Sequence, residues 1–122
     1  MTKFLKLWLP VIIWAIVIFQ FSGSSTAPIE PTSLLNIVIR KLAHISEYAF
    51  FFYLLARALQ TRKYIPYALA LAIFYAFTDE THQLFTPDRT ASLTDVFFFD
   101  LIGMIPLWFI LNRFPKLLKW YV

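Results

Sequence analysis

The chain has 122 residues, of which 60% are hydrophobic, 20% aromatic and 15% charged, and its mean hydropathy is +0.67. A soluble globular chain is about 45–50% apolar, so this composition excludes an ordinary water-soluble domain and an intrinsically disordered chain. The sequence has no cysteine, which excludes disulfides and cysteine nucleophiles, and the basic residues behind its net charge of +4 lie beside apolar runs, which argues against nucleic-acid binding.

The first apolar segment covers about residues 4–21 and ends at a run of small polar residues that begins with Ser22. A membrane-spanning helix needs about 20 apolar residues, and this segment has nearly that length. A signal peptide is the alternative, because Lys3 and Lys6 precede the apolar stretch and small residues follow it. We expect a retained first span.

Three more apolar segments follow, and charged or turn residues separate them. Helical turns at residues 34–39 precede the second span and are expected to begin along the membrane interface. The sequence therefore predicts an all-α fold, a single domain over residues 1–122 with about four transmembrane helices in an antiparallel bundle. The three spans are predicted over residues 41–58, 64–78 and 95–112.

The orientation of the bundle follows from the basic residues, because Lys and Arg stay in the cytoplasm during membrane insertion. With the N-terminus inside, most of the 11 basic residues fall on the inner side, and Arg40, Lys41 and Arg89 are the outer cations. All 7 acidic residues fall in the outer half. This pattern predicts a multi-pass protein of the cytoplasmic membrane with both termini inside.

Polar residues on the second span line up at helical spacing. Lys41, His44 and Tyr48 follow an i, i+3, i+7 pattern, and Arg40 and Glu47 lie on the adjoining flank. Charges at membrane depth are costly, by about 2.5–3.5 kcal/mol each, so they pair within a bundle or mark a function. This stripe is predicted to face the interior of the bundle.

A second polar stripe ends the third span. Asp79, His82 and Gln83 share one face, and Glu80 lies close to Gln83 around the helix. Since the second and third spans are antiparallel, the two stripes are predicted to meet at the outer end, where Asp95 and Asp100 enter from the start of the fourth span. The structural alternative is a charge network that only fixes the register of the helices.

The same residues fit several kinds of site. Glu80 or Glu47 could act as a general base with His44 as its partner, which would make the protein an intramembrane enzyme. A metal site on His44, Glu80 and His82 is only weakly indicated by the spacing, so we assign neither a metal nor another cofactor. Alternatively, the outer cations would hold the anionic group of a ligand.

The polar residues lie within motifs that resemble the VanZ-like family over nearly the whole chain. The motifs are Lys41-Leu42-Ala43-His44 with Glu47-Tyr48, the string Asp79-Glu80-Thr81-His82-Gln83-Leu84-Phe85-Thr86-Pro87-Asp88-Arg89, and then Ser92, Asp95 and Gly103. The resemblance implies a bacterial membrane protein of about four helices, in a family whose named member contributes to resistance against the glycopeptide antibiotic teicoplanin. Asp100 departs from the family pattern, which usually has asparagine there, and a buried acid at this position must be paired or protonated.

The expected function is therefore a role in teicoplanin resistance or in envelope lipid homeostasis. The expected partners are membrane lipids and a lipid-linked envelope precursor or lipoglycopeptide, whose anionic headgroup the outer polar site would bind. An oligomeric transporter or flippase is a further alternative, and four spans would have to form a homo-oligomer to enclose a path. The expected ligand-binding residues are Arg40, Lys41, Tyr48, Asp79, Gln83, Arg89 and Asp95.

Overall fold

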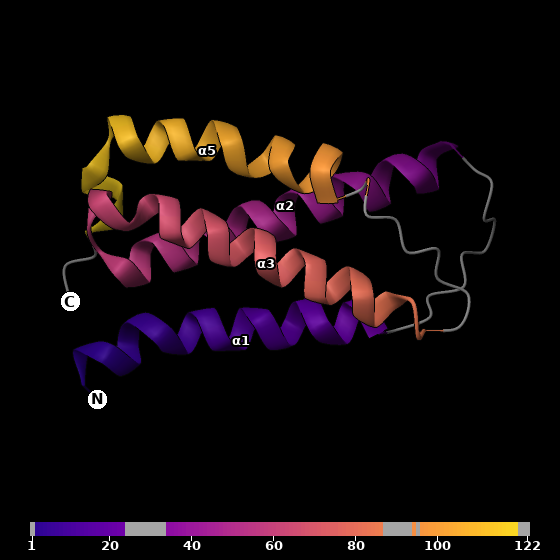
Figure 1. Ribbon diagram of the computed structural model, residues 1–122, viewed down its shortest axis with the longest axis horizontal. Helices are drawn as coiled ribbons and strands as arrows, with labels where there is room; N and C mark the ends of the chain where they lie inside the picture. The colour runs from indigo at the N-terminus through magenta and orange to yellow at the C-terminus, as the bar shows by residue number, and fades with distance from the viewer. Residues whose placement is uncertain (1, 24–33, 87–93, 95, 120–122) are drawn as a thin grey trace.

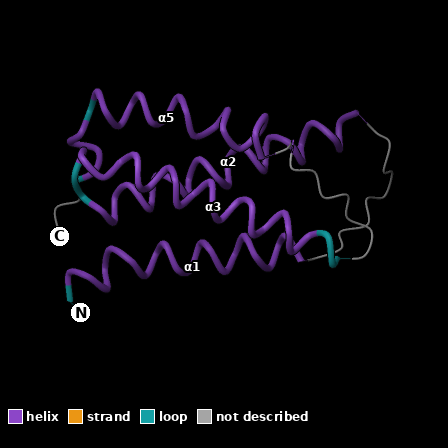
Figure 2. Tube along the Cα trace, in the orientation of Figure 1, coloured by secondary structure: helices purple, strands orange, loops and turns teal. Residues whose placement is uncertain are grey.

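The computed structural model describes residues 2–23, 34–86, 94 and 96–119, with the backbone alone at residues 96 and 97. The described residues are almost entirely helical and include no strand, so the predicted all-α class is confirmed for them (Figures 1 and 2). The long helices are α1 (Lys3–Gly23), α2 (Leu34–Leu59), α3 (Ile65–Gln83) and α5 (Leu101–Arg113). Shorter elements are the 3-10 turns Arg62–Tyr64 and Pro115–Leu118 and the π-helical turn Val96–Asp100.

The helices form an antiparallel bundle in which α1 and α3 run one way and α2 and α5 run the other way (Figure 1). Helix α2 contacts α1, α3 and α5, and α1 and α5 lie on opposite sides of the α2–α3 pair. Among the described helices, α1 is the one long and apolar enough throughout to cross a membrane. Four spans and the sides of the two termini therefore stay predictions.

Helix α2 is continuous from Leu34 to Leu59, as expected for helical turns at residues 34–39 that lead into the second apolar segment. Two other helix boundaries differ from the predicted ones. Helix α3 continues to Gln83 and so includes the whole second polar stripe, where apolar length alone ended the span at residue 78. The fourth segment begins as a π-helical turn and becomes α-helical at Leu101. A π turn leaves no mark in the 3.6-residue periodicity from which that segment was predicted as one helix.

The packing between helices uses small residues inside and large ones outside. On α3, Ala68, Ala72 and Ala76 are completely buried, whereas Leu71 and Phe74 are exposed. Small residues let helix backbones approach closely, and this is how helices associate where the surroundings are as apolar as their own side chains. The exposed face of α3 therefore carries larger apolar side chains than its buried face.

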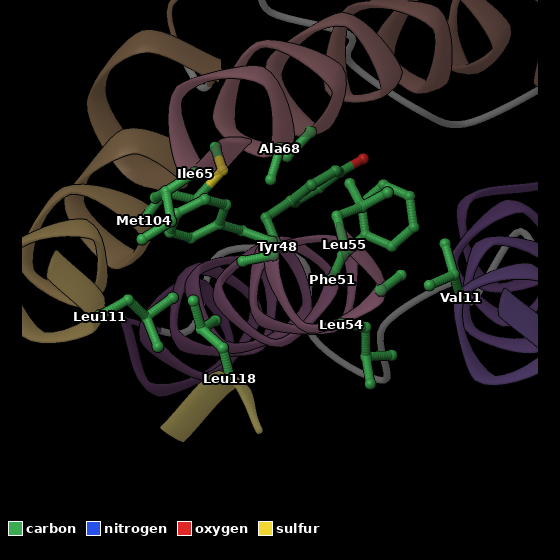
Figure 3. Close-up of a cluster of buried hydrophobic side chains, with 14 of the residues drawn as sticks. Val11, Tyr48, Phe51, Leu54, Leu55, Ile65, Ala68, Met104, Leu111 and Leu118 are labelled. Carbon is green, nitrogen blue, oxygen red and sulfur yellow. The ribbon is translucent and has the colours of Figure 1, made fainter. Parts of the chain in front are cut away.

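A cluster of buried apolar side chains surrounds the second half of α2 (Figure 3). Phe51 and Leu55 of α2 lie on the side of the cluster toward Val11 of α1, and Met104 and Leu111 of α5 lie on its opposite side. Phe52 of α2 and Ile65 of α3 are completely buried in the same cluster. Helix α2 is thus the central element, and its fixed position sets where its polar stripe lies.

Pro10 accounts for one hydrogen bond between α1 and α2. Proline has no backbone N–H, so the carbonyl of Lys6, four residues earlier, receives no helical hydrogen bond from position 10. The buried guanidinium of Arg57 donates to that carbonyl, with Nη2 at 3.2 Å from the oxygen. The proline therefore creates the acceptor that joins the start of α1 to the end of α2.

Two more bonds hold α1 along its length. The indole Nε1 of Trp14 donates to the carbonyl oxygen of Glu47 at 3.1 Å. The hydroxyl of Tyr75 donates to the carbonyl oxygen of Ala15 at 2.6 Å. Because these bonds start from neighbouring points on α1 and reach α2 and α3, they fix α1 against both helices beside the polar residues.

Candidate functional site

Charged residues are sorted between the two ends of the bundle. The described carboxylates, Glu47, Asp79, Glu80 and Asp100, lie in the half where α1 and α3 end, which we call the acidic end. The opposite half, where α2 and α5 end, is the basic end. The described basic residues there are Lys3, Lys6, Arg57, Arg62, Lys63, Arg113, Lys116 and Lys119.

A buried hydrogen-bonded group joins α2 to α3 at the acidic end. The hydroxyl of Tyr48 donates to Oδ2 of Asp79 at 2.7 Å. The amide of Gln83, one turn along α3, donates to the same oxygen at 3.3 Å. Asp79 is only 3% exposed, and Tyr48 and Gln83 are also buried. The two predicted stripes therefore meet at Asp79, whose carboxylate two donors hold in place.

The other oxygen of this carboxylate, Oδ1, is buried and has no hydrogen-bond partner among the described residues. Burying an acceptor without a hydrogen-bond partner destabilises the folded state by about 1–3 kcal/mol. Ser22 Oγ and His82 Nδ1, at the ends of α1 and α3, are buried and unpartnered in the same way. Among the described residues, the acidic end thus contains buried hydrogen-bonding atoms that the other side chains do not use.

A second pair lies beside this group. Nδ1 of His44 is 3.1 Å from Oδ1 of Asp100, at the end of the π-helical turn. Asp100 is 1% exposed and the side chain of His44 is 25% exposed. Sequence reasoning left the role of Asp100 open, and the structure pairs this buried acid with His44.

Gly103 permits that pairing. A Cβ atom at this position would lie 2.6 Å from the carbonyl oxygen of Ile45 and 3.2 Å from Cβ of Ala49. Such distances cannot be accommodated without moving backbone. The missing side chain therefore lets α5 approach α2 one turn after Asp100, which brings Asp100 to His44.

The two glutamates proposed as general bases lie near the same histidine. Glu80 is 4% exposed, Glu47 is half-buried, and both interact electrostatically with His44. Asp100 acts on Tyr48 in the same way, and Asp79 acts on Tyr75. The acidic end therefore forms one electrostatically connected cluster with an excess of carboxylates.

The described cations of this end lie further out along α2. Arg40 is exposed, and Lys41 is half-buried with Nζ 4.3 Å from the centre of the Phe99 ring, in the geometry of a cation–π contact. Lys41 precedes Tyr48 by two helical turns, so it lies about 10 Å from that residue along the axis. Positive charge thus lies at the rim and negative charge lies deeper.

His82 faces α1 and lies apart from the His44 pair. Its ring stacks on Phe19 at 4.1 Å between centres, and its Cε1 lies close to Gly23. In the described part of the chain, no three His, Asp or Glu side chains are grouped so that they could share a metal ion. The metal candidates His44 and His82 therefore point to different neighbours.

Comparison with known protein families addresses the resemblance directly. Residues 7–115 match the family model described as VanZ/LLP1, which covers most of the chain. The chain belongs to the VanZ/LLP1 family. No curated protein and no solved structure gave a significant match.

In this VanZ/LLP1 protein, the structure brings together most of the residues that the sequence singled out. His44, Tyr48, Asp79, Glu80 and Gln83 share the acidic end, with Lys41 at its rim. Arg89 and Asp95, which belong to the same set of expected ligand-binding residues, lie outside the described residues.

Sequence reasoning placed Asp100 in this region without assigning it a role, and it missed two other contributors, Tyr75 and the hydroxyl of Ser22. Tyr75 gave no signal, because a tyrosine is an ordinary residue in an apolar helix. Ser22 was noted only as part of the small polar run that ends the first span. Tyr75 matters because it holds α1 against the end of the bundle that contains Asp79.

Proposed function

We propose that this VanZ/LLP1 protein binds the polar headgroup of a lipid-linked envelope precursor or lipoglycopeptide at its acidic end, and that this binding supports glycopeptide resistance or envelope lipid homeostasis. The observation that carries the proposal is Oδ1 of Asp79. Tyr48 and Gln83 occupy the other oxygen and orient the carboxylate, which supports a role of the buried Oδ1 as the acceptor for a donor on the ligand.

The carboxylate lies deep and the cations lie at the rim, and this arrangement supports a headgroup that has both hydrogen-bond donors and an anionic group. Its hydroxyl or amine donors would reach Asp79, while its phosphate or carboxylate would interact with Lys41 and Arg40 about 10 Å away along α2. A glycosyl phosphate or a glycopeptide has both kinds of group over such a length. Arg89 is proposed to join the cationic rim.

The surroundings of the site support a membrane location. Helix α1 has 21 residues and α3 has 19, which correspond to about 32 and 28 Å, close to the roughly 30 Å hydrocarbon core of a bilayer. Their exposed faces are large and apolar, and the buried face of α3 is small. In the proposed topology, all four helical segments span the bacterial cytoplasmic membrane, both termini are cytoplasmic, and the acidic end faces outward.

Binding to the purified protein tests the proposal. The probes are teicoplanin and a fluorescently labelled lipid-linked disaccharide-peptide precursor, each titrated against protein in detergent micelles. We expect Asp79→Asn to raise the Kd about tenfold or more, because it replaces an acceptor oxygen with a donor and removes a charge. Lys41→Gln should raise it as well, by about the same factor.

Lys116→Gln is the matched control, since Lys116 is an exposed cation at the opposite end. It should bind both probes as the unmodified protein does. If Asp79→Asn and Lys41→Gln, with normal unfolding midpoints, both bind the probes as tightly as the control, the acidic end is not the binding site.

A second candidate function, catalysis on the same headgroup, is favoured by the His44–Asp100 pair. A carboxylate that holds one ring nitrogen of a histidine orients the other nitrogen, as in acid–base catalytic groups. Glu80, buried near His44, would then be the general base. Glu80→Gln should keep ligand binding and lose turnover. Identical products from lipid extracts incubated with either protein, measured by mass spectrometry, would remove this candidate.

A further inference from the structure

A cleft lies at the basic end, far from the carboxylates. It has a volume of about 310 Å³ and is lined by Arg62, Phe109, Asn112 and Arg113. Arg62 comes from the turn before α3, and the other three come from the last turns of α5. Two helices that are distant in the sequence therefore place two guanidinium groups around one opening.

The amide of Asn112 orients Arg62 in this cleft. Its Nδ2 donates to the carbonyl oxygen of Trp108 at 2.8 Å, which turns Oδ1 toward Arg62. Nε of Arg62 then donates to that oxygen at 3.4 Å. The terminal nitrogens of Arg62 make no hydrogen bond or ion pair within the described part of the chain, so they present a fork of donors to the cleft.

Neither arginine of the cleft has a carboxylate partner among the described residues. Arg113 contacts the ring of Phe114, with Cζ at 5.8 Å from its centre. The described acids all belong to the opposite end. Two unneutralised guanidinium groups around one opening are the arrangement that recognises a phosphate, because each can donate two parallel hydrogen bonds to its oxygens.

We propose that this cleft binds the phosphate group of an anionic phospholipid. Phe109 is the reason to choose a lipid over a soluble phosphate: it is 61% exposed and lies in the wall of the cleft. Ile105, one turn earlier on α5, is also exposed on the same face. Together they continue from the arginines along the helix as an apolar track that fits an acyl chain. The proposal is independent of the ligand at the acidic end.

Native mass spectrometry of the full chain in detergent, titrated with phosphatidylglycerol, tests the site. We expect Arg62→Gln and Arg113→Gln each to reduce the affinity for phosphatidylglycerol about tenfold, the effect of losing one charge-assisted contact. Lys116→Gln, which removes an exposed cation of the same end outside the cleft, should change it less than twofold. Unfolding midpoints measured on the same samples identify any variant that is misfolded.

Two further probes identify the class of ligand. Phosphatidylcholine, which has no net charge, should bind at least tenfold more weakly, and millimolar inorganic phosphate should not displace the bound lipid.

Equal losses of affinity in Lys116→Gln and the two arginine variants would overturn the proposal, because the general charge of this end would then explain the binding. Displacement by inorganic phosphate would overturn the lipid assignment. A double variant Arg62→Lys/Arg113→Lys that binds as tightly as the unmodified protein would overturn the role of the guanidinium forks.

Discussion

At the acidic end, ionisable side chains are buried and bonded to one another, whereas at the basic end Arg62 and Arg113 are exposed around an open cleft. The difference is one of depth. Asp79, Glu80 and Asp100 lie inside the bundle and need fixed partners, while most of the cations lie on its outside. Arg57 is the buried cation of the basic end, and it too bonds a neighbouring helix.

This contrast agrees with different roles for the two groups of charges. Charges on the outside of a helix end direct insertion and attract anionic headgroups without a large effect on folding. Buried charges must be compensated, so they are retained either as a rigid network or as a site. Substitutions at matched positions of the two ends should therefore differ in their effect on the free energy of unfolding.

The largest expected effect is that of Asp79→Leu. Tyr48 and Gln83 would then be buried donors without an acceptor, so we expect a loss of about 2–4 kcal/mol in the free energy of unfolding, measured by SDS titration in mixed micelles. Arg113→Leu at the basic end should leave the unfolding curve unchanged. Similar losses of unfolding free energy in the two variants would show that the ends do not differ in how much their charged residues contribute to stability.

The two glycines of the chain give the next largest contrast. Gly103→Ala places Cβ 2.6 Å from a backbone oxygen of α2, so we expect a loss of about 1–3 kcal/mol as α5 moves outward. Gly23→Ala meets only the side chain of His82, at 3.1 Å, which can shift, and should cost less. The same SDS titration measures both variants. A reversed order would mean that α5 does not pack closely against α2.

The smallest expected effect is that of Tyr48→Phe, which removes one buried hydrogen bond to Asp79. We expect a loss of about 1 kcal/mol, since the ring and its packing stay in place. Tyr53→Phe is the control, because its hydroxyl is exposed and its bond to the carbonyl of Leu117 is long, at 3.4 Å. Equal unfolding midpoints for Tyr48→Phe and Tyr53→Phe would show that the bond to Asp79 contributes nothing to stability.

Much of the fold could be predicted from apolar length and charge. The first span was predicted over residues 4–21 and α1 is Lys3–Gly23, because an apolar run bounded by charged or small polar residues marks its own ends. Helical spacing put Tyr48 and Asp79 at the same end, and the structure has them hydrogen-bonded. Their part in ligand binding is a proposal that geometry alone does not test.

Other features depend on contacts that periodicity does not contain. His82 is three residues from Asp79 and faces inward as predicted, but toward α1, where its ring stacks on Phe19, and not toward the pair of Tyr48 and Asp79. The inner face of α3 is shared between α1 and α2, so one stripe serves two neighbours. The contact of Asp100 with His44 needs both the π-helical turn and the close approach at Gly103, and a spacing of 100° per residue encodes neither.

The bonds from Trp14 and Tyr75 end on main-chain oxygens, those of Glu47 and Ala15. Every amino acid offers that oxygen, so the docking of α1 does not depend on which side chain stands at position 47. A substitution at position 47 therefore leaves the acceptor of the Trp14 bond in place, and α1 can keep its position against α2 whatever the side chain there does.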